Sequence, residues 1–104
     1  MIERNVLYNI DFYKTSNYNR QLLPYYGSHQ GMRFKIEYIK GNEEENTPTI
    51  LRAWVFPEPL CFDATDDSLK ESKDFEASNE GLDSVCEWLN ESYEAKKDYY
   101  QTKI

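Results

Sequence analysis

A run from Met32 to Lys40 constrains the fold more than any other part of the sequence, because apolar and polar side chains alternate along it. A period of two is typical of a β-strand that buries one face and exposes the other. Residues 49–56 form a second run that is rich in β-branched and aromatic residues, and its apolar residues lie on both faces, which favours a central strand. Strands over 31–40 and 49–56 are close enough in sequence to predict an antiparallel hairpin.

The C-terminal part of the chain has the periodicity of an amphipathic helix. Apolar residues recur there every three or four positions and form one stripe: Leu82, Val85, Cys86, Leu89, Tyr93 and Tyr100. Ser78 stands just before this stripe and is a favoured N-cap residue. The spacing predicts a helix over about 79–98 that packs on the sheet.

The remaining segments complete the expected fold. Four apolar residues alternate with polar ones near the N-terminus: Val6, Tyr8, Ile10 and Phe12. This alternation predicts a strand over about 5–13, whereas the turn residues of 15–30 predict a loop and the polar residues of 63–78 a long acidic loop. The sequence therefore predicts one α+β domain over 1–104, with about three antiparallel strands and one C-terminal amphipathic helix on one face of the sheet.

Charge and hydropathy exclude several classes of function. The chain has 104 residues, with 12 Lys and Arg against 19 Asp and Glu, and a net charge of -7. Proteins that bind duplex DNA gain affinity by neutralising phosphates with cations, so direct duplex binding is not expected. No apolar run approaches the roughly 20 residues of a membrane span. The first residues lack the basic and apolar blocks of a signal peptide, which makes the cytosol the expected compartment.

The sequence offers few groups for catalysis or metal binding. Cys61 and Cys86 are expected to be reduced and buried, and His29 is the one histidine. The spacing of these residues matches no zinc motif, and Gly27 to Gly31 lacks the Gly-Lys-Ser/Thr ending of a phosphate-binding loop. We therefore expect a protein that is not an enzyme, with no catalytic residue, metal or cofactor.

Charge is segregated along the chain. Residues 1–40 carry a net charge of +3, whereas residues 57–98 carry -9. Five acids of the predicted helix fall within roughly 80° of arc, opposite the apolar stripe: Glu80, Asp83, Glu87, Glu91 and Glu94. Four acids of the preceding loop join them in the predicted partner-binding set: Asp66, Asp67, Glu71 and Asp74.

Such a row of carboxylates imitates the phosphates of a nucleic-acid strand. It predicts a non-enzymatic inhibitor that docks on a basic protein, such as a nuclease or another nucleic-acid-binding protein, and competes with the nucleic acid. The alternative interpretation is an ordinary solvated helix face. The helix dipole favours acids near the N-terminus, which accounts for Glu80 and Asp83 but less well for Glu87, Glu91 and Glu94.

Two other functions remain open. The first is a protein-interaction or homodimerisation module that binds through Trp88, Tyr99, Tyr100 or an exposed sheet edge. The protein would then be a monomer or a homodimer. The second is a single-stranded nucleic-acid binder in which aromatic rings stack on bases and cations meet phosphates. Its candidate residues lie in the first half of the chain: Arg20, Tyr25, Tyr26, Arg33 and Lys35.

Four stretches carry a resemblance to known proteins: Gly31 to Ile36, Arg52 to Pro59, Ser78 to Leu82 and Glu87 to Glu91. Over about residues 31–94 the chain resembles small acidic proteins of phages and bacterial mobile elements. The resemblance implies a strand, a strand that ends at prolines and a capped helix, and it brings no catalytic residues. In size and charge the chain is also similar to small acidic phage proteins that block host defence nucleases, anti-CRISPR proteins among them.

Overall fold

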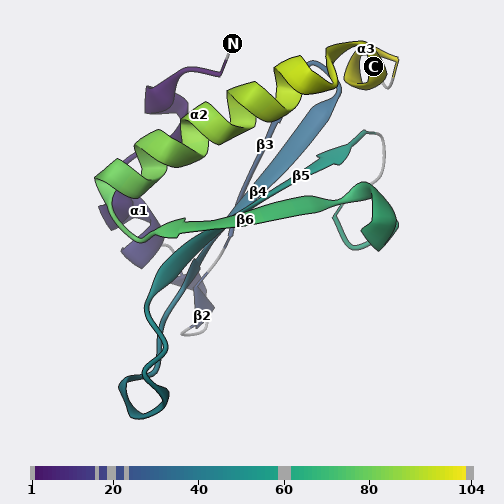
Figure 1. Cartoon of the computed structure of the whole chain (residues 1–104). Coiled ribbons are helices and arrows are strands. Elements are labelled where there is room, and N and C mark those ends of the chain that lie inside the picture. The colour runs from purple at the N-terminus through teal and green to yellow at the C-terminus, as the bar shows by residue number, and fades with distance from the viewer. Residues whose placement is uncertain (1, 16, 19–20, 23, 59–61, 103–104) are drawn as a thin grey trace.

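A four-stranded antiparallel sheet with a long helix across one face forms the centre of the protein (Figure 1). The structure is a computed structural model that describes residues 2–15, 17–18, 21–22, 24–58 and 62–102, with the backbone alone at residues 15, 17–18, 21–22 and 43. The strands lie in the order β3 (Tyr25–His29), β4 (Met32–Ile39), β5 (Ile50–Pro57) and β6 (Glu71–Glu76). The prediction of an α+β fold is thus confirmed, although the sheet has four strands rather than three.

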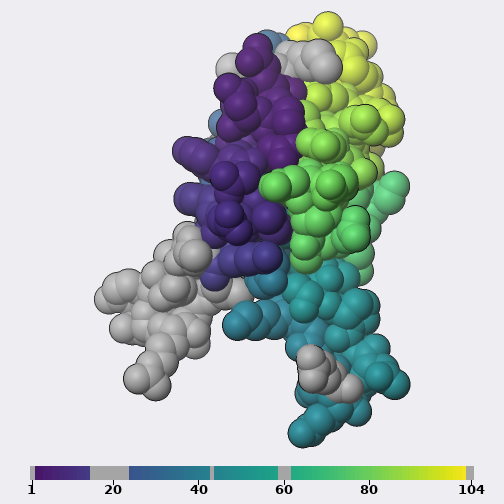
Figure 2. Space-filling view, turned by 90° about the vertical axis from the view of Figure 1, so that its left-hand side faces the viewer, coloured from purple at the N-terminus to yellow at the C-terminus, as the bar shows by residue number. Residues whose placement is uncertain are grey.

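The predicted hairpin is confirmed as the centre of the sheet. β4 and β5 pair antiparallel in a register that puts Lys35 opposite Trp54 and Phe34 opposite Val55. The short 3-10 helix η2 (Glu43–Glu45) joins these strands. Figures 1 and 2 both show this connection projecting beyond the sheet, away from α2 (Asn79–Ala95).

The N-terminal segment differs from its prediction. Instead of a strand over 5–13, the chain forms the 3-10 helix η1 (Arg4–Leu7) and the short helix α1 (Ile10–Thr15). Three residues spaced three apart are buried, namely Leu7, Ile10 and Tyr13. The alternating apolar residues predicted to share a buried face are instead mostly exposed, with Val6, Tyr8 and Phe12 at the surface. The segment packs beside α2 (Figure 2).

Both predicted loops contain strands. Residues 15–30 include the two-residue pair β1 (Asn17–Tyr18) and β2 (Gln21–Leu22) as well as the edge strand β3. Residues 63–78 include the 3-10 helix η3 (Asp67–Leu69) and the other edge strand, β6. The sequence of β6 does not alternate between apolar and polar residues, and Phe75 is its one half-buried apolar side chain. Backbone pairing with β5 forms this strand instead.

The C-terminal helix begins as predicted and ends earlier. The Ser78 hydroxyl accepts a hydrogen bond of 3.0 Å from the Gly81 amide, which confirms the N-cap. The helix α2 ends at Ala95, and a separate short helix, α3 (Lys97–Gln101), follows. All six residues of the predicted apolar stripe are buried: Leu82, Val85, Cys86, Leu89, Tyr93 and Tyr100. They pack against the inward side chains of β4 and β5 to form the main core.

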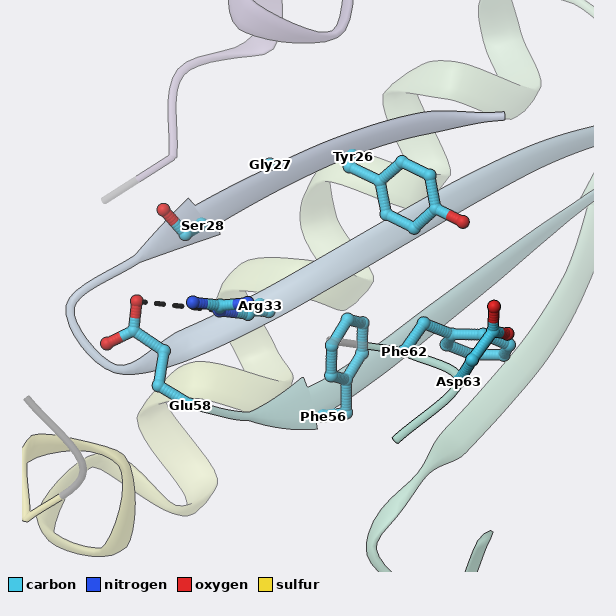
Figure 3. Close-up of a pocket in the computed structure, with 8 residues that line it drawn as sticks. All are labelled: Tyr26, Gly27, Ser28, Arg33, Phe56, Glu58, Phe62 and Asp63. Carbon is cyan, nitrogen blue, oxygen red and sulfur yellow. Dashed lines mark ion pairs between the residues drawn. The ribbon is translucent and has the colours of Figure 1, made fainter. Parts of the chain in front are cut away.

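The opposite face of the sheet carries a second, smaller aromatic cluster. The Phe62 ring lies 5.1 Å from the Trp54 ring and 5.5 Å from the Phe56 ring, measured between centroids. The ammonium groups of Lys35 and Lys70 lie 3.9 and 4.0 Å from the Phe62 centroid, within cation–π range. These contacts hold the segment after β5 against the far side of the sheet from α2 (Figure 3).

None of the helices in the described residues is long and apolar enough to cross a lipid bilayer.

Alkaline pH is expected to destabilise the protein through Tyr100. Burial, followed by the nearby charge of Glu71, raises the pKa of this phenol from 10.0 to about 12. The folded state therefore holds the phenol proton more tightly than the unfolded chain does. This contribution is fully present below pH 10 and is lost as the pH rises from about 10 to about 12, at a cost of about 2–3 kcal/mol.

The Tyr100→Phe variant tests this prediction, because it has no proton to lose. In urea unfolding at several pH values, its stability should fall less than that of the wild type between pH 10 and 12. Burial also raises the pKa of Tyr13, which is present in both proteins and cancels in the comparison. Identical losses of stability in the two proteins would show that the Tyr100 phenol makes no such contribution.

Candidate functional site

The outward face of α2 presents all five acids that the sequence predicts there. Glu80, Asp83, Glu87, Glu91 and Glu94 are all exposed, because the buried stripe of α2 takes the opposite side of the helix. From the first to the last of them the helix rises about 21 Å, at 1.5 Å per residue.

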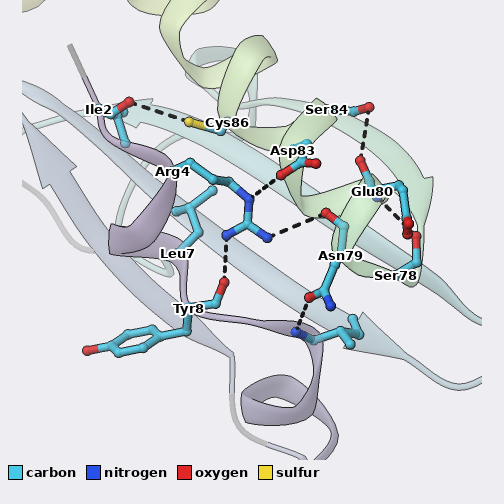
Figure 4. Close-up of polar contacts among 12 residues, drawn as sticks. Ile2, Arg4, Leu7, Tyr8, Ser78, Asn79, Glu80, Asp83, Ser84 and Cys86 are labelled. Atoms are coloured by element: carbon cyan, nitrogen blue, oxygen red, sulfur yellow. Dashed lines mark hydrogen bonds and ion pairs between the residues drawn. The ribbon is translucent and has the colours of Figure 1, made fainter.

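Asp83 is the one member of this row that a cation neutralises within the described part of the chain. The Arg4 guanidinium donates from Nε to the Asp83 carboxylate at 2.6 Å. The same side chain donates to the backbone oxygens of Tyr8 at 2.6 Å and Asn79 at 3.4 Å (Figure 4). Arg4 thereby ties the N-terminal segment to the start of α2 and removes Asp83 from the charge available to a partner.

The four predicted acids outside α2 have structural partners. The Asp66 carboxylate accepts from the Ser68 amide at 3.0 Å, and this bond lowers the pKa of Asp66. The Lys70 ammonium donates to Asp67 at 3.1 Å, and the Lys96 ammonium donates to Glu71 at 2.6 Å.

Asp74 is engaged across the sheet. Arg52 on β5 donates two hydrogen bonds to its carboxylate, at 2.7 and 3.2 Å, and these bonds lower the pKa of Asp74. Asp74 and Glu71 are three residues apart on β6 and point to opposite faces of the sheet. The nine predicted acids therefore do not form one surface. Four exposed glutamates without an ion pair to a described residue remain, and we call them the α2 acidic stripe: Glu80, Glu87, Glu91 and Glu94.

The residues predicted to bind single-stranded nucleic acid are divided between the faces of the sheet. Tyr26, Arg33 and Lys35 lie on the face opposite α2, whereas Tyr25 lies on the α2 side, where its hydroxyl donates to the Val6 carbonyl at 3.2 Å. Arg20 lies outside the described residues.

The cations of that opposite face have carboxylates beside them. The Lys35 ammonium lies 2.7 Å from Glu37, and Arg33 Nε lies 3.7 Å from Glu58. A face without excess positive charge has little to offer a phosphate backbone, so the geometry supports this alternative less than the acidic one.

Two of the three aromatic residues suggested for self-association pack against the rest of the protein. Tyr100 is buried, and Trp88 is half-buried with its ring 5.9 Å from that of Phe75, whereas Tyr99 is exposed. The edge strand β6 exposes both acidic and basic side chains along its length: Glu71, Lys73, Asp74 and Glu76. Charged side chains on an edge strand disfavour pairing with the edge of another sheet.

Cys86 and His29 both contact residues from other segments of the chain. Cys86 is a free, buried cysteine whose pKa is raised by burial, and its thiol donates to the Ile2 carbonyl at 3.4 Å. Cys61 lies outside the described residues. Burial lowers the pKa of His29, whose ring packs edge-on against Tyr93 at 4.7 Å. Within the described residues, no three His, Cys, Asp or Glu side chains are arranged to hold a metal ion.

Sequence reasoning missed two surface features. The first is the contact of the Phe62 ring with Trp54 and Phe56 on the sheet face opposite α2. The second is the exposed aromatic pair Tyr8 and Phe12, whose rings stack at 4.5 Å. Tyr8 has a φ of 62°, a left-handed conformation that is costly for a bulky residue.

Tyr8 and Phe12 are only four residues apart, but both rings also contact Tyr25 from β3. The Phe62 cluster likewise includes Lys35 from β4. These contacts with Tyr25 and Lys35 form only in the folded chain.

Comparison of the chain with protein-family models, with curated proteins and with solved structures found no match.

Proposed function

We propose that this protein is a non-enzymatic binding protein that docks the α2 acidic stripe on a basic surface of another protein. The partner is a protein that handles nucleic acid, such as a nuclease, and the docked helix keeps nucleic acid off that surface. One observation carries the proposal: four exposed carboxylates lie along one side of a single 17-residue helix, and none of them forms an ion pair with a described residue.

The stripe is costly for the isolated protein, which favours a role in binding. Glu87 and Glu91 are four residues apart, and Glu94 follows three residues later. Like charges at these spacings destabilise a helix by about 0.2–0.5 kcal/mol for each pair. Two cations next to α2 in the fold, Arg4 and Lys96, pair instead with Asp83 and Glu71. The stripe therefore keeps its negative charge for a cationic partner.

The spacing of the stripe suits a surface that binds a nucleic-acid strand. Side chains three or four residues apart on a helix lie about 5–6 Å from each other, so Glu87, Glu91 and Glu94 form a close row of negative charge. Glu80 lies seven residues before Glu87, or roughly 10 Å along the helix axis. Proteins that bind nucleic acid offer a groove of lysines and arginines to a row of phosphates. Attraction between such surfaces speeds association and weakens as salt rises.

A titration with a defined polycation tests where this protein binds positive charge. The probe is a peptide of ten lysines, added to isotope-labelled protein while backbone amide signals are recorded. We expect the largest shifts along α2. Glu87→Lys/Glu91→Lys should weaken binding by about tenfold or more, because two attractive contacts become repulsive.

The matched control is Glu44→Lys/Glu45→Lys in η2, since each double variant changes the net charge from -7 to -3. The control should weaken binding by no more than about threefold, because only long-range attraction is lost. Equal weakening by both variants would mean that net charge alone attracts the peptide, and the proposal would be wrong. Thermal unfolding of both variants confirms that they are folded.

A further inference from the structure

A cavity of about 400 Å³ lies on the sheet face opposite α2, at the end of β5. Its walls come from β3, β4, β5 and the segment after β5 (Figure 3). Ligand sites for small molecules begin at about 300 Å³, so the cavity is large enough for one long side chain or a small molecule. Its position on the far face of the sheet separates it from the α2 acidic stripe.

Aromatic rings form much of the cavity wall. Tyr26 is 53% exposed and offers its ring to a ligand, whereas the Phe56 ring is buried beneath and the Phe62 ring is half-buried beside it. Figure 3 shows these three rings, from three different segments, around a common space. The Lys35 ammonium lies 3.9 Å from the Phe62 centroid and 5.7 Å from the Tyr26 centroid, and the Glu37 carboxylate at 2.7 Å balances its charge.

The charges at the cavity favour a cationic ligand. The lining contains two carboxylates, of Glu58 and Asp63, and one guanidinium, of Arg33. Arg33 Nε lies 3.7 Å from Glu58, and Asp63 is exposed and forms no ion pair with any described residue. An anionic ligand would meet the charge of Asp63 in addition to the field of a protein with a net charge of -7.

We propose that this cavity binds the arginine side chain of a basic peptide or protein segment. The planar guanidinium stacks on the exposed Tyr26 ring, as guanidinium groups do on aromatic faces, and pairs with the Asp63 carboxylate. The aliphatic part of the arginine covers Phe56 and Phe62. A lysine ammonium would lack the flat face that the stacking uses, which makes arginine the better ligand.

The test uses three small probes on the isotope-labelled full chain. The first is an N-acetylated, C-amidated Gly-Arg-Gly peptide, the second is the same peptide with citrulline, which has the shape of arginine without its charge, and the third is uridine monophosphate. We expect the arginine peptide to shift the amides of Gly27, Ser28 and Asp63 saturably, with a dissociation constant of about 1 mM, and citrulline to bind about tenfold more weakly. Equal shifts with citrulline, no saturable shift, or shifts with the nucleotide alone would overturn the proposal.

Two variants locate the site. Asp63→Asn should weaken arginine binding by about fivefold, whereas Glu45→Gln, which removes the same charge from η2, should leave binding within about twofold. Tyr26→Leu keeps an apolar side chain but removes the stacking surface, and it should weaken binding as well. Equal effects of Asp63→Asn and Glu45→Gln would overturn the proposal. The Glu87→Lys/Glu91→Lys variant should bind the arginine peptide like the wild type, so this test stands apart from that of the α2 acidic stripe.

Discussion

Replacing Leu89 with alanine is expected to destabilise the protein by about 2–5 kcal/mol. Leu89 is fully buried in the core between α2 and the sheet. Removing its branched end loses apolar burial and leaves a cavity that the rigid sheet cannot close. A domain of this size has about 5–15 kcal/mol of stability in total, so the change removes a large part of it.

Leu69→Ala is the matched control for this prediction. Leu69 is 49% exposed in η3, and the same substitution there should cost less than about 0.5 kcal/mol. Urea unfolding of both variants gives the two free energies directly. Similar losses of unfolding free energy at the two positions would contradict the assignment of the apolar side of α2 to the main core.

The parts of the fold that could be predicted are those in which one long, regular pattern has one structural solution. β4 and β5 each have eight residues with continuous strand character, and α2 has apolar residues at helical spacing from Leu82 to Tyr93, over about three turns. Ser78 marked the start of α2 correctly because its cap is a local interaction. These elements bury enough apolar surface to decide their own structure.

The N-terminal segment could not be predicted because two patterns overlap in it. Val6, Tyr8 and Phe12 alternate as in a strand, while Leu7 and Tyr13 have helical spacing with Ile10. Contacts made by the folded chain decide between these patterns. The Tyr13 hydroxyl donates to the Leu7 carbonyl at 2.7 Å, and Arg4 reaches α2 across 79 positions of sequence.

The positions of the α2 acids could be predicted from the sequence, whereas their ion pairs could not. A helical wheel is enough to place the five α2 acids outward, since the buried side of α2 is apolar. Their counter-ions could not be foreseen, because Arg4, Arg52 and Lys96 meet Asp83, Asp74 and Glu71 only after the chain has folded. β6 was hidden for a similar reason, since its partner β5 supplies the hydrogen bonds that its polar sequence does not suggest.

Binding to a natural partner is expected to depend on two glutamates of the α2 acidic stripe. Glu87→Lys/Glu91→Lys should lower retention of the partner by about tenfold or more, because two lysines would face its basic surface. The Glu44→Lys/Glu45→Lys variant has the same net charge as the Glu87→Lys/Glu91→Lys variant. It should still retain the partner, since η2 projects away from α2. The partner should also be released as the salt concentration rises to about 0.5 M, because the Debye length is then only a few ångströms.

The most direct test is quantitative capture from a lysate of the organism that encodes the protein, with the wild type and the two double variants immobilised in parallel. The account predicts a basic, nucleic-acid-binding protein that is retained by the wild type and by Glu44→Lys/Glu45→Lys, lost with Glu87→Lys/Glu91→Lys, and displaced by added nucleic acid. Two results would contradict the account. In one, the wild type and both double variants retain the same proteins. In the other, no protein retained by the wild type is lost with Glu87→Lys/Glu91→Lys.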